Sequence, residues 1–159
     1  MVNFVNGDLF STPAPVIAHQ VNCMGVMGSG VAKTVKELYP EVYEDYKKAI
    51  TQLNHECLGG CLLSKTTHGD KYIANLFGQY YYRGCPEEPK PTASRYTNYE
   101  ALYRSLVRLR SEMEERNLGS VAFPYKLGSS RGGADWNVVL EIIKSVFNNS
   151  KTEVWIYRI

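Results

Sequence analysis

A glycine-rich segment between an apolar strand and a helix constrains this chain more than any other stretch. Val16–Val21 is an apolar run typical of a buried strand, and Val31–Tyr39 has helical periodicity. The segment Asn22–Ala32 carries three glycines, which allow a tight turn with exposed N–H groups. The positive end of the next helix dipole adds to these donors. We call this segment the first glycine loop; it predicts a phosphate-binding loop, with a plain tight turn as the alternative.

A second unit of the same kind lies near the end of the chain. The strand-like run Ser120–Pro124 leads into Lys126–Ala134, the second glycine loop, and a helical pattern follows from Trp136 to Phe147. Ligands of α/β sheets favour the crevice beyond the carboxyl ends of the strands. Neither loop has the Gly-Lys-Ser/Thr ending of a P-loop or the glycine spacing of a dinucleotide fingerprint. The pair therefore predicts a nucleotide diphosphate held in a less common way.

Strands and helices alternate along the chain, which predicts an α/β fold with a central mixed, largely parallel sheet covered on both faces. We expect one domain over residues 1–159. Pro40 separates the first two helices because it cannot continue a helix. Thr97 or Asn98 would cap the third helix, and Asp135 the fourth. The expected strands are Val2–Val5, Val16–Val21, Cys61–Thr66, Tyr72–Phe77, Ser120–Pro124 and Glu153–Tyr157, and the expected helices are Val31–Tyr39, Glu41–Leu53, Tyr99–Arg116 and Asp135–Phe147.

Charge and hydropathy limit the partners. Eighteen Lys and Arg residues face sixteen Asp and Glu residues, so the balance gives no strong signal for nucleic acid. No apolar run is long enough to span a bilayer, and the first residues lack the features of a signal peptide. We expect a cytoplasmic, stand-alone, monomeric protein whose four cysteines are reduced.

Four residues with ligand-type side chains invite a zinc interpretation: His55, Cys57, Cys61 and His68. Their spacing fits no common zinc finger or ribbon. Cys61 also begins an expected strand, on which neighbouring side chains point to opposite faces. We therefore predict no metal site and no cofactor.

The segment Tyr80–Pro91 breaks the alternation, because its three prolines bar regular structure. Long ordered loops after the carboxyl end of a strand are often functional. An exposed connector whose tyrosines pack back on the body explains the segment equally well, so both interpretations stay open.

In their order and spacing, these segments resemble a macrodomain, the ADP-ribose-binding module with three α/β/α layers. The resemblance covers essentially the whole chain. It runs from Val5–Phe10, which is similar to the family's opening strand followed by Gly-Asp-Leu, through Asn22–Ala32 and Asn75–Gln79, to Pro124–Trp136 and the strand ending at Ile159. It implies the three-layer fold and ADP-ribose derivatives as small-molecule ligands.

The resemblance also implies a set of ligand contacts. Asp8 would accept a hydrogen bond from the adenine amine, and Leu9 would be a ligand-binding residue beside it; a turn residue is the alternative for Asp8. Asn22 would bond the distal ribose, since an amide both donates and accepts. Arg131 would add a charge-assisted contact to phosphate, or be solvated. The loops would enclose the diphosphate with Gly25, Met27, Gly28, Ser29, Gly30 and Val31 on one side and with Leu127, Gly128, Ser129, Ser130, Arg131, Gly132 and Gly133 on the other.

Two departures bear on the chemistry. Macrodomains that remove ADP-ribose from glutamate or DNA carry a lysine shortly after the fourth strand and often an aspartate in the second loop. Here Gln79 and Gly132 take these places, and an amide cannot form the adduct that an amine can. The segments His19–Cys23, Asn75–Gln79 and Gly132–Trp136 instead resemble the ADP-ribose-1''-phosphate phosphatases.

That branch implies hydrolysis of ADP-ribose-1''-phosphate, with His19, Asn22 and Asp135 as catalytic residues. His19 ionises in the range suited to proton transfer near neutral pH. It stands three residues before Asn22, which places it on the opposite strand face, and a structural histidine is the alternative. Asp135 would orient a water or serve only as a helix cap. A glycohydrolase that de-ADP-ribosylates protein or nucleic acid, and a non-catalytic ADP-ribose reader, are the alternative functions.

Overall fold

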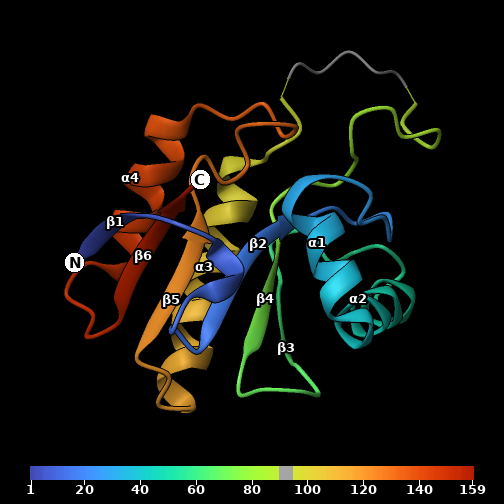
Figure 1. The fold of residues 1–159 in the computed structure, drawn as a ribbon. Helices are drawn as coiled ribbons and strands as arrows, with labels where there is room; N and C mark the ends of the chain where they lie inside the picture. The colour runs from blue at the N-terminus through green and yellow to red at the C-terminus, as the bar shows by residue number, and fades with distance from the viewer. Residues whose placement is uncertain (90–94) are drawn as a thin grey trace.

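The computed structural model describes residues 1–89 and 95–159 (Figure 1). They form one six-stranded sheet in the order β1-β6-β5-β2-β4-β3, in which only the β3–β4 pair is antiparallel. The predicted α/β fold with a mixed, largely parallel sheet is confirmed. The elements are β1 (Val2–Asn6), the 3-10 helix η1 (Leu9–Ser11), β2 (Val16–Val21), α1 (Gly30–Leu38), α2 (Pro40–Gln52), β3 (Cys61–Lys65), β4 (Tyr72–Phe77), α3 (Tyr99–Glu115), β5 (Ser120–Pro124), α4 (Trp136–Phe147) and β6 (Glu153–Arg158).

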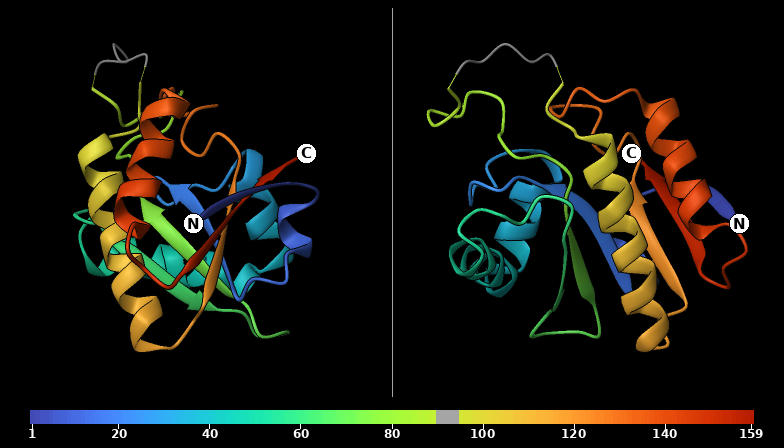
Figure 2. Two further views of the ribbon diagram at one scale, coloured as in Figure 1. Left: turned by 90° about the vertical axis from the view of Figure 1, so that its left-hand side faces the viewer. Right: turned by 180° about the vertical axis from the view of Figure 1, so that it is seen from behind.

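The sheet separates two helical layers. Helices α1 and α2 lie on one face, and α3 and α4 lie on the other (Figure 2). The side chains of β2 alternate between two cores, because successive residues of a strand point to opposite faces. Val16 and Ala18 belong to the core under α3 and α4, whereas Ile17 and Val21 belong to the core under α1 and α2. The chain therefore has the three α/β/α layers that were expected.

Helix starts follow the predicted capping residues. Pro40 occupies the first turn of α2, where its missing N–H costs no hydrogen bond. Asn98, rather than Thr97, caps α3 by accepting from the Ala101 amide at 3.0 Å. Asp135 caps α4 by accepting from the Asn137 amide at 2.9 Å. The element that the sequence did not predict is η1.

Strand β2 pairs very differently with its two neighbours. It is joined to β4 from Val16 through Val21, but it pairs with β5 only through Val16 and Ile17. Beyond those two residues, no further pairing joins β2 to β5 in the described chain. The carboxyl ends of the two strands are thus not paired with each other, and the two glycine loops follow them.

The residues considered for zinc are not gathered around one point. All four cysteines are free, and His55 Nδ1 lies 2.7 Å from the carbonyl oxygen of Cys23. Within residues 1–89 and 95–159, no three His, Cys, Asp or Glu side chains gather into a metal-type cluster. None of the helices in these residues has the length and apolar character needed to cross a membrane.

Candidate functional site

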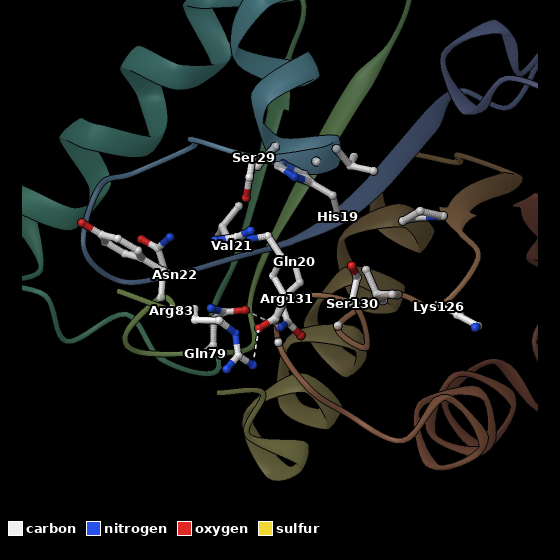
Figure 3. Close-up of a pocket in the computed structure, with 18 of the residues that line it drawn as sticks. His19, Gln20, Val21, Asn22, Ser29, Gln79, Arg83, Lys126, Ser130 and Arg131 are labelled. Atoms are coloured by element: carbon white, nitrogen blue, oxygen red, sulfur yellow. Dashed lines mark hydrogen bonds between the residues drawn. The ribbon is translucent and has the colours of Figure 1, made fainter. Parts of the chain in front are cut away.

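A cavity of about 480 Å³ lies between the carboxyl ends of β2 and β5 (Figure 3). Both glycine loops contribute to its wall, so residues about a hundred positions apart in the chain meet across it. The structure thus brings together most of the residues that the sequence predicted for the site. Those that line the cavity are His19, Asn22, Gly28, Ser29, Gly30, Val31, Leu127, Gly128, Ser130, Arg131 and Gly132.

Seven predicted site residues lie outside the cavity lining: Asp8, Leu9, Gly25, Met27, Ser129, Gly133 and Asp135. Leu9 and Met27 are buried in the core under α1 and α2. The carboxylates of Asp8 and Asp135 cap η1 and α4. For Asp135, the helix-cap alternative matches the geometry, because its carboxylate already accepts a backbone N–H.

Asn22 braces the first glycine loop from within. Its side-chain oxygen accepts from the Met24 amide at 2.9 Å and from the Tyr46 hydroxyl at 2.8 Å, and its Nδ2 donates to the Val26 carbonyl at 2.8 Å. A side-chain amide has two N–H donors, so one remains for a ligand hydroxyl. Asn22 can therefore donate to a ribose, but its acceptor capacity is already used inside the loop.

Replacing Asn22 by alanine is expected to lower the free energy of unfolding by about 2 kcal/mol, since several hydrogen bonds of a 7% exposed side chain are lost together. Ligand affinity should fall as well, because the loop amides lose their support. Urea denaturation and calorimetric titration measure the two effects. Asn148→Ala, an exposed asparagine at the end of α4, is the matched control. Unchanged stability in Asn22→Ala would show that the loop does not depend on this brace.

His19 lies on β2 and is only 1% exposed. Its Nε2 is 2.7 Å from Asn75 Oδ1, and Asn75 Nδ2 in turn donates to the Leu62 carbonyl at 3.0 Å. This amide orientation makes His19 Nε2 the donor, so Nδ1 is the unprotonated nitrogen of the neutral ring. Burial lowers the pKa of His19 to about 4, which keeps the ring neutral at pH 7. Nδ1 is buried and has no hydrogen-bond partner in the described part of the chain.

His19 and Asn22 line the same cavity, although strand alternation predicted opposite faces. The reason is that β2 ends at Val21, so Asn22 is no longer part of the pleat. The low pKa also corrects the expectation that His19 ionises near neutrality. A neutral His19 is suited to accepting a hydrogen bond rather than to carrying a proton at pH 7.

A polar network supports the second glycine loop. Gln20 Nε2 donates to Gln79 Oε1 at 2.7 Å and to the Thr97 hydroxyl at 2.8 Å. The Thr97 hydroxyl donates to the Gly128 carbonyl at 2.8 Å, and the Gly132 carbonyl accepts from the Thr97 amide at 3.0 Å. Gln79 is thus fixed in this network by its side chain.

Sequence reasoning missed nine residues of the wall, although the unusual segment Tyr80–Pro91 was a signal for two of them. Lys90 and Pro91 of that segment lie outside the described residues. We call residues 79–89 the strap; it borders the cavity through Gln79, Tyr82 and Arg83. The missed residues are Gln20, Val21, Val26, Ala32, Tyr82, Arg83, Pro124, Tyr125 and Lys126.

The charged side chains that line the cavity are all positive. Arg83, Lys126 and Arg131 line it, and among the described residues no aspartate or glutamate does. Lys126 has a φ of 63°, a left-handed conformation that is uncommon for a residue other than glycine. Cationic side chains, together with the backbone amides of two glycine loops, favour an anionic ligand.

Comparisons with known proteins point to one family. The Macro domain family model matches residues 18–143. The DNA ADP-ribosyl glycohydrolase of Mycobacterium tuberculosis is 31% identical over 149 residues, which cover 92% of this chain and 39% of that protein. The ADP-ribose 1''-phosphate phosphatase of Lodderomyces elongisporus is 31% identical over 144 residues, which cover 85% of this chain and 86% of that protein.

A solved structure agrees with these sequence relatives. The macrodomain of Mycobacterium tuberculosis DarG superposes with a TM-score of 0.84 at 28% identity, covering 100% of this chain and 98% of that one. The chain nevertheless spans only 39% of the length of the mycobacterial glycohydrolase that it matches.

Proposed function

Because this chain belongs to the Macro domain family, we propose that it binds ADP-ribose derivatives in the cavity between its two glycine loops. The names of its glycohydrolase and phosphatase relatives share one chemical group, ADP-ribose. Lys126 and Arg131 of the second glycine loop, on a wall to which no carboxylate of the described residues contributes, are the observation that carries the proposal, since they suit the charge of a diphosphate. The diphosphate would lie between the loops, and the distal ribose would lie beside Asn22.

The reaction that we propose is hydrolysis of ADP-ribose-1''-phosphate to ADP-ribose and phosphate. Water attacks phosphorus, the bond between phosphorus and the ribose oxygen breaks, and that oxygen takes up a proton. Backbone amides of the loops and the cationic side chains would stabilise the charge on the transferring group. His19, whose Nδ1 is buried, would position the cavity wall beside the ribose through its contact with Asn75. Asn22 would donate its remaining N–H to the ribose.

Two features support the phosphatase over lysine-dependent chemistry. Gln79 cannot supply an amine, and both ends of its amide are occupied, since Nε2 also donates to the Tyr81 carbonyl at 2.8 Å. Gly132 supplies no carboxylate, and its surroundings leave no space for one. The phosphatase relative also matches this chain over most of both lengths.

The direct test is incubation of the protein with ADP-ribose-1''-phosphate while free phosphate and ADP-ribose are followed. We expect the two products in equal amounts. Protein in which Gly28 is replaced by valine is the matched control, because Gly28 lines the cavity and a Cβ there meets only the Val26 side chain, at 3.5 Å, so the added bulk would take up space in the diphosphate seat. Binding of ADP-ribose without release of phosphate would contradict the phosphatase and support a reader.

A glycohydrolase is the second candidate, favoured by the mycobacterial relative of that name, which matches 92% of this chain. Its substrate would be an ADP-ribosylated nucleotide in DNA or an ADP-ribosylated side chain in protein. Incubation with an ADP-ribosylated oligonucleotide distinguishes the two reactions. Release of ADP-ribose from it, with ADP-ribose-1''-phosphate left intact, would replace the phosphatase by the glycohydrolase.

A further inference from the structure

The strap forms part of the cavity wall and is held in place by hydrogen bonds. The Cys23 amide donates to the Tyr80 carbonyl at 2.9 Å, which joins the strap to the first glycine loop. Near its other end, the Tyr96 hydroxyl donates to Glu88 Oε1 at 3.0 Å. Between these points, Cys85 is buried and its thiol donates to Glu87 Oε2 at 3.0 Å. Tyr82 and Arg83 are therefore presented to the cavity from a segment anchored on both sides.

Arg83 reaches from the strap to the second glycine loop. Its Nη2 donates to the carbonyl oxygen of Arg131 at 3.1 Å (Figure 3). Its guanidinium carbon also lies 5.1 Å from the centre of the Tyr96 ring, a cation–π distance. These contacts fix the guanidinium at the cavity wall, and pre-organised donors bind a ligand at lower entropic cost.

The position of Arg83 decides which part of a ligand it meets. Figure 3 draws Arg83 on the side of the cavity where Asn22 and Gln79 lie, with Lys126 on the opposite side. The hydrogen bond from Cys23, the residue after Asn22, to the strap agrees with this placement. Under the proposed function, Asn22 lies beside the distal ribose. Arg83 then faces the end of the ligand that carries the 1''-substituent.

We infer that Arg83 is a specificity-determining residue, whose guanidinium binds the phosphate monoester on the distal ribose and distinguishes ADP-ribose-1''-phosphate from ADP-ribose. This inference rests on the proposed function. A planar guanidinium can donate two parallel hydrogen bonds to a phosphate. The glutamates of the strap, Glu87 and Glu88, accept from Cys85 and Tyr96, and neither lines the cavity.

The experiment is calorimetric titration with ADP-ribose and with its non-hydrolysable 1''-phosphonate analogue. In Arg83→Gln, affinity for the phosphonate should fall about tenfold or more, the effect of a charge-assisted hydrogen bond, while affinity for ADP-ribose should change less than about threefold. Arg83→Lys should recover part of the lost affinity, because lysine keeps the positive charge but lacks the paired N–H donors of a guanidinium. Arg108→Gln, an exposed arginine of α3 outside the cavity, is the matched control.

Equal losses for both ligands, or no loss for either, would overturn the inference. So would a wild-type protein that binds both ligands equally. A wild-type protein that binds neither ligand would instead refute the proposed function itself, so the two failures are distinct. Thermal melting of each variant in the same buffer separates a loss of binding from a loss of folding. Should Arg83→Gln not fold, Arg83→Lys must still show the selective loss.

Discussion

Replacement of Gly132 by alanine is expected to lower the free energy of unfolding by about 3 kcal/mol and to abolish ligand binding, because a Cβ there is forced into filled space. An ideal Cβ at Gly132 overlaps the Thr97 hydroxyl and the Gly128 carbonyl oxygen. Neither atom is at the end of a flexible chain, since Thr97 is 2% exposed and the carbonyl is backbone. The second glycine loop must therefore move away from the network of Gln20 and Thr97.

Two other glycines provide controls of matched chemistry. A Cβ at Gly28, in the first glycine loop, meets only Val26 Cγ1 at 3.5 Å, and a Cβ at Gly119 meets no atom within 4 Å. Gly28→Ala and Gly119→Ala should therefore keep wild-type stability. Urea denaturation measures the stability of each variant, and titration with ADP-ribose measures its affinity for the ligand. A Gly132→Ala protein as stable as Gly119→Ala would contradict the packing argument.

Acidification from pH 7 to pH 4.5 is expected to cost about 2 kcal/mol of stability through His19. Burial holds the pKa of His19 at about 4 in the folded chain, below the 6.5 of the free side chain. The unfolded chain therefore binds the proton first. The stabilisation is complete above pH 6.5 and is lost as the pH falls toward 4.

The measurement is urea denaturation of the wild type and of His19→Gln over this pH range. The variant should lose about 2 kcal/mol less than the wild type between pH 7 and pH 4.5. His68→Gln, at an exposed histidine after β3, is the matched substitution measured beside it. If the free energy of unfolding depends on pH in the same way in the wild type and in His19→Gln, the pKa of His19 does not differ between the folded and unfolded chain.

The regular elements were predictable because apolar periodicity and capping residues are local signals. The ends of β2, β4 and β5 coincide with the predictions, and Asp135 caps α4 as its sequence position suggested. The sequence predicted that glycines would form the two loops, but it did not predict which atoms confine each glycine. Gly132 is confined by Thr97, which lies more than thirty positions away, and no local pattern contains that contact.

The unpredicted parts of the site depend on contacts between distant segments. Arg83 reaches the cavity because the strap contacts the second glycine loop through the hydrogen bond from Arg83 to Arg131. The prolines of the strap predict only that it has no regular structure. The acceptor capacity of Asn22 is spent on Tyr46, which lies on α2 and could not be assigned to this contact from sequence. Likewise, the sharing of one cavity by His19 and Asn22 depends on the residue at which β2 stops pairing.

The early parting of β2 and β5 has a mechanical consequence. Among the described residues, the two halves of the sheet, β1-β6-β5 on one side and β2-β4-β3 on the other, are joined through strand pairing only at Val16 and Ile17. Each half ends in one of the two glycine loops, so a ligand held by both loops ties the halves together at the open end of this seam. Such a ligand acts as a cross-link in place of the hydrogen bonds that β2 and β5 do not form beyond Ile17. Its binding energy therefore opposes separation of the two halves of the sheet.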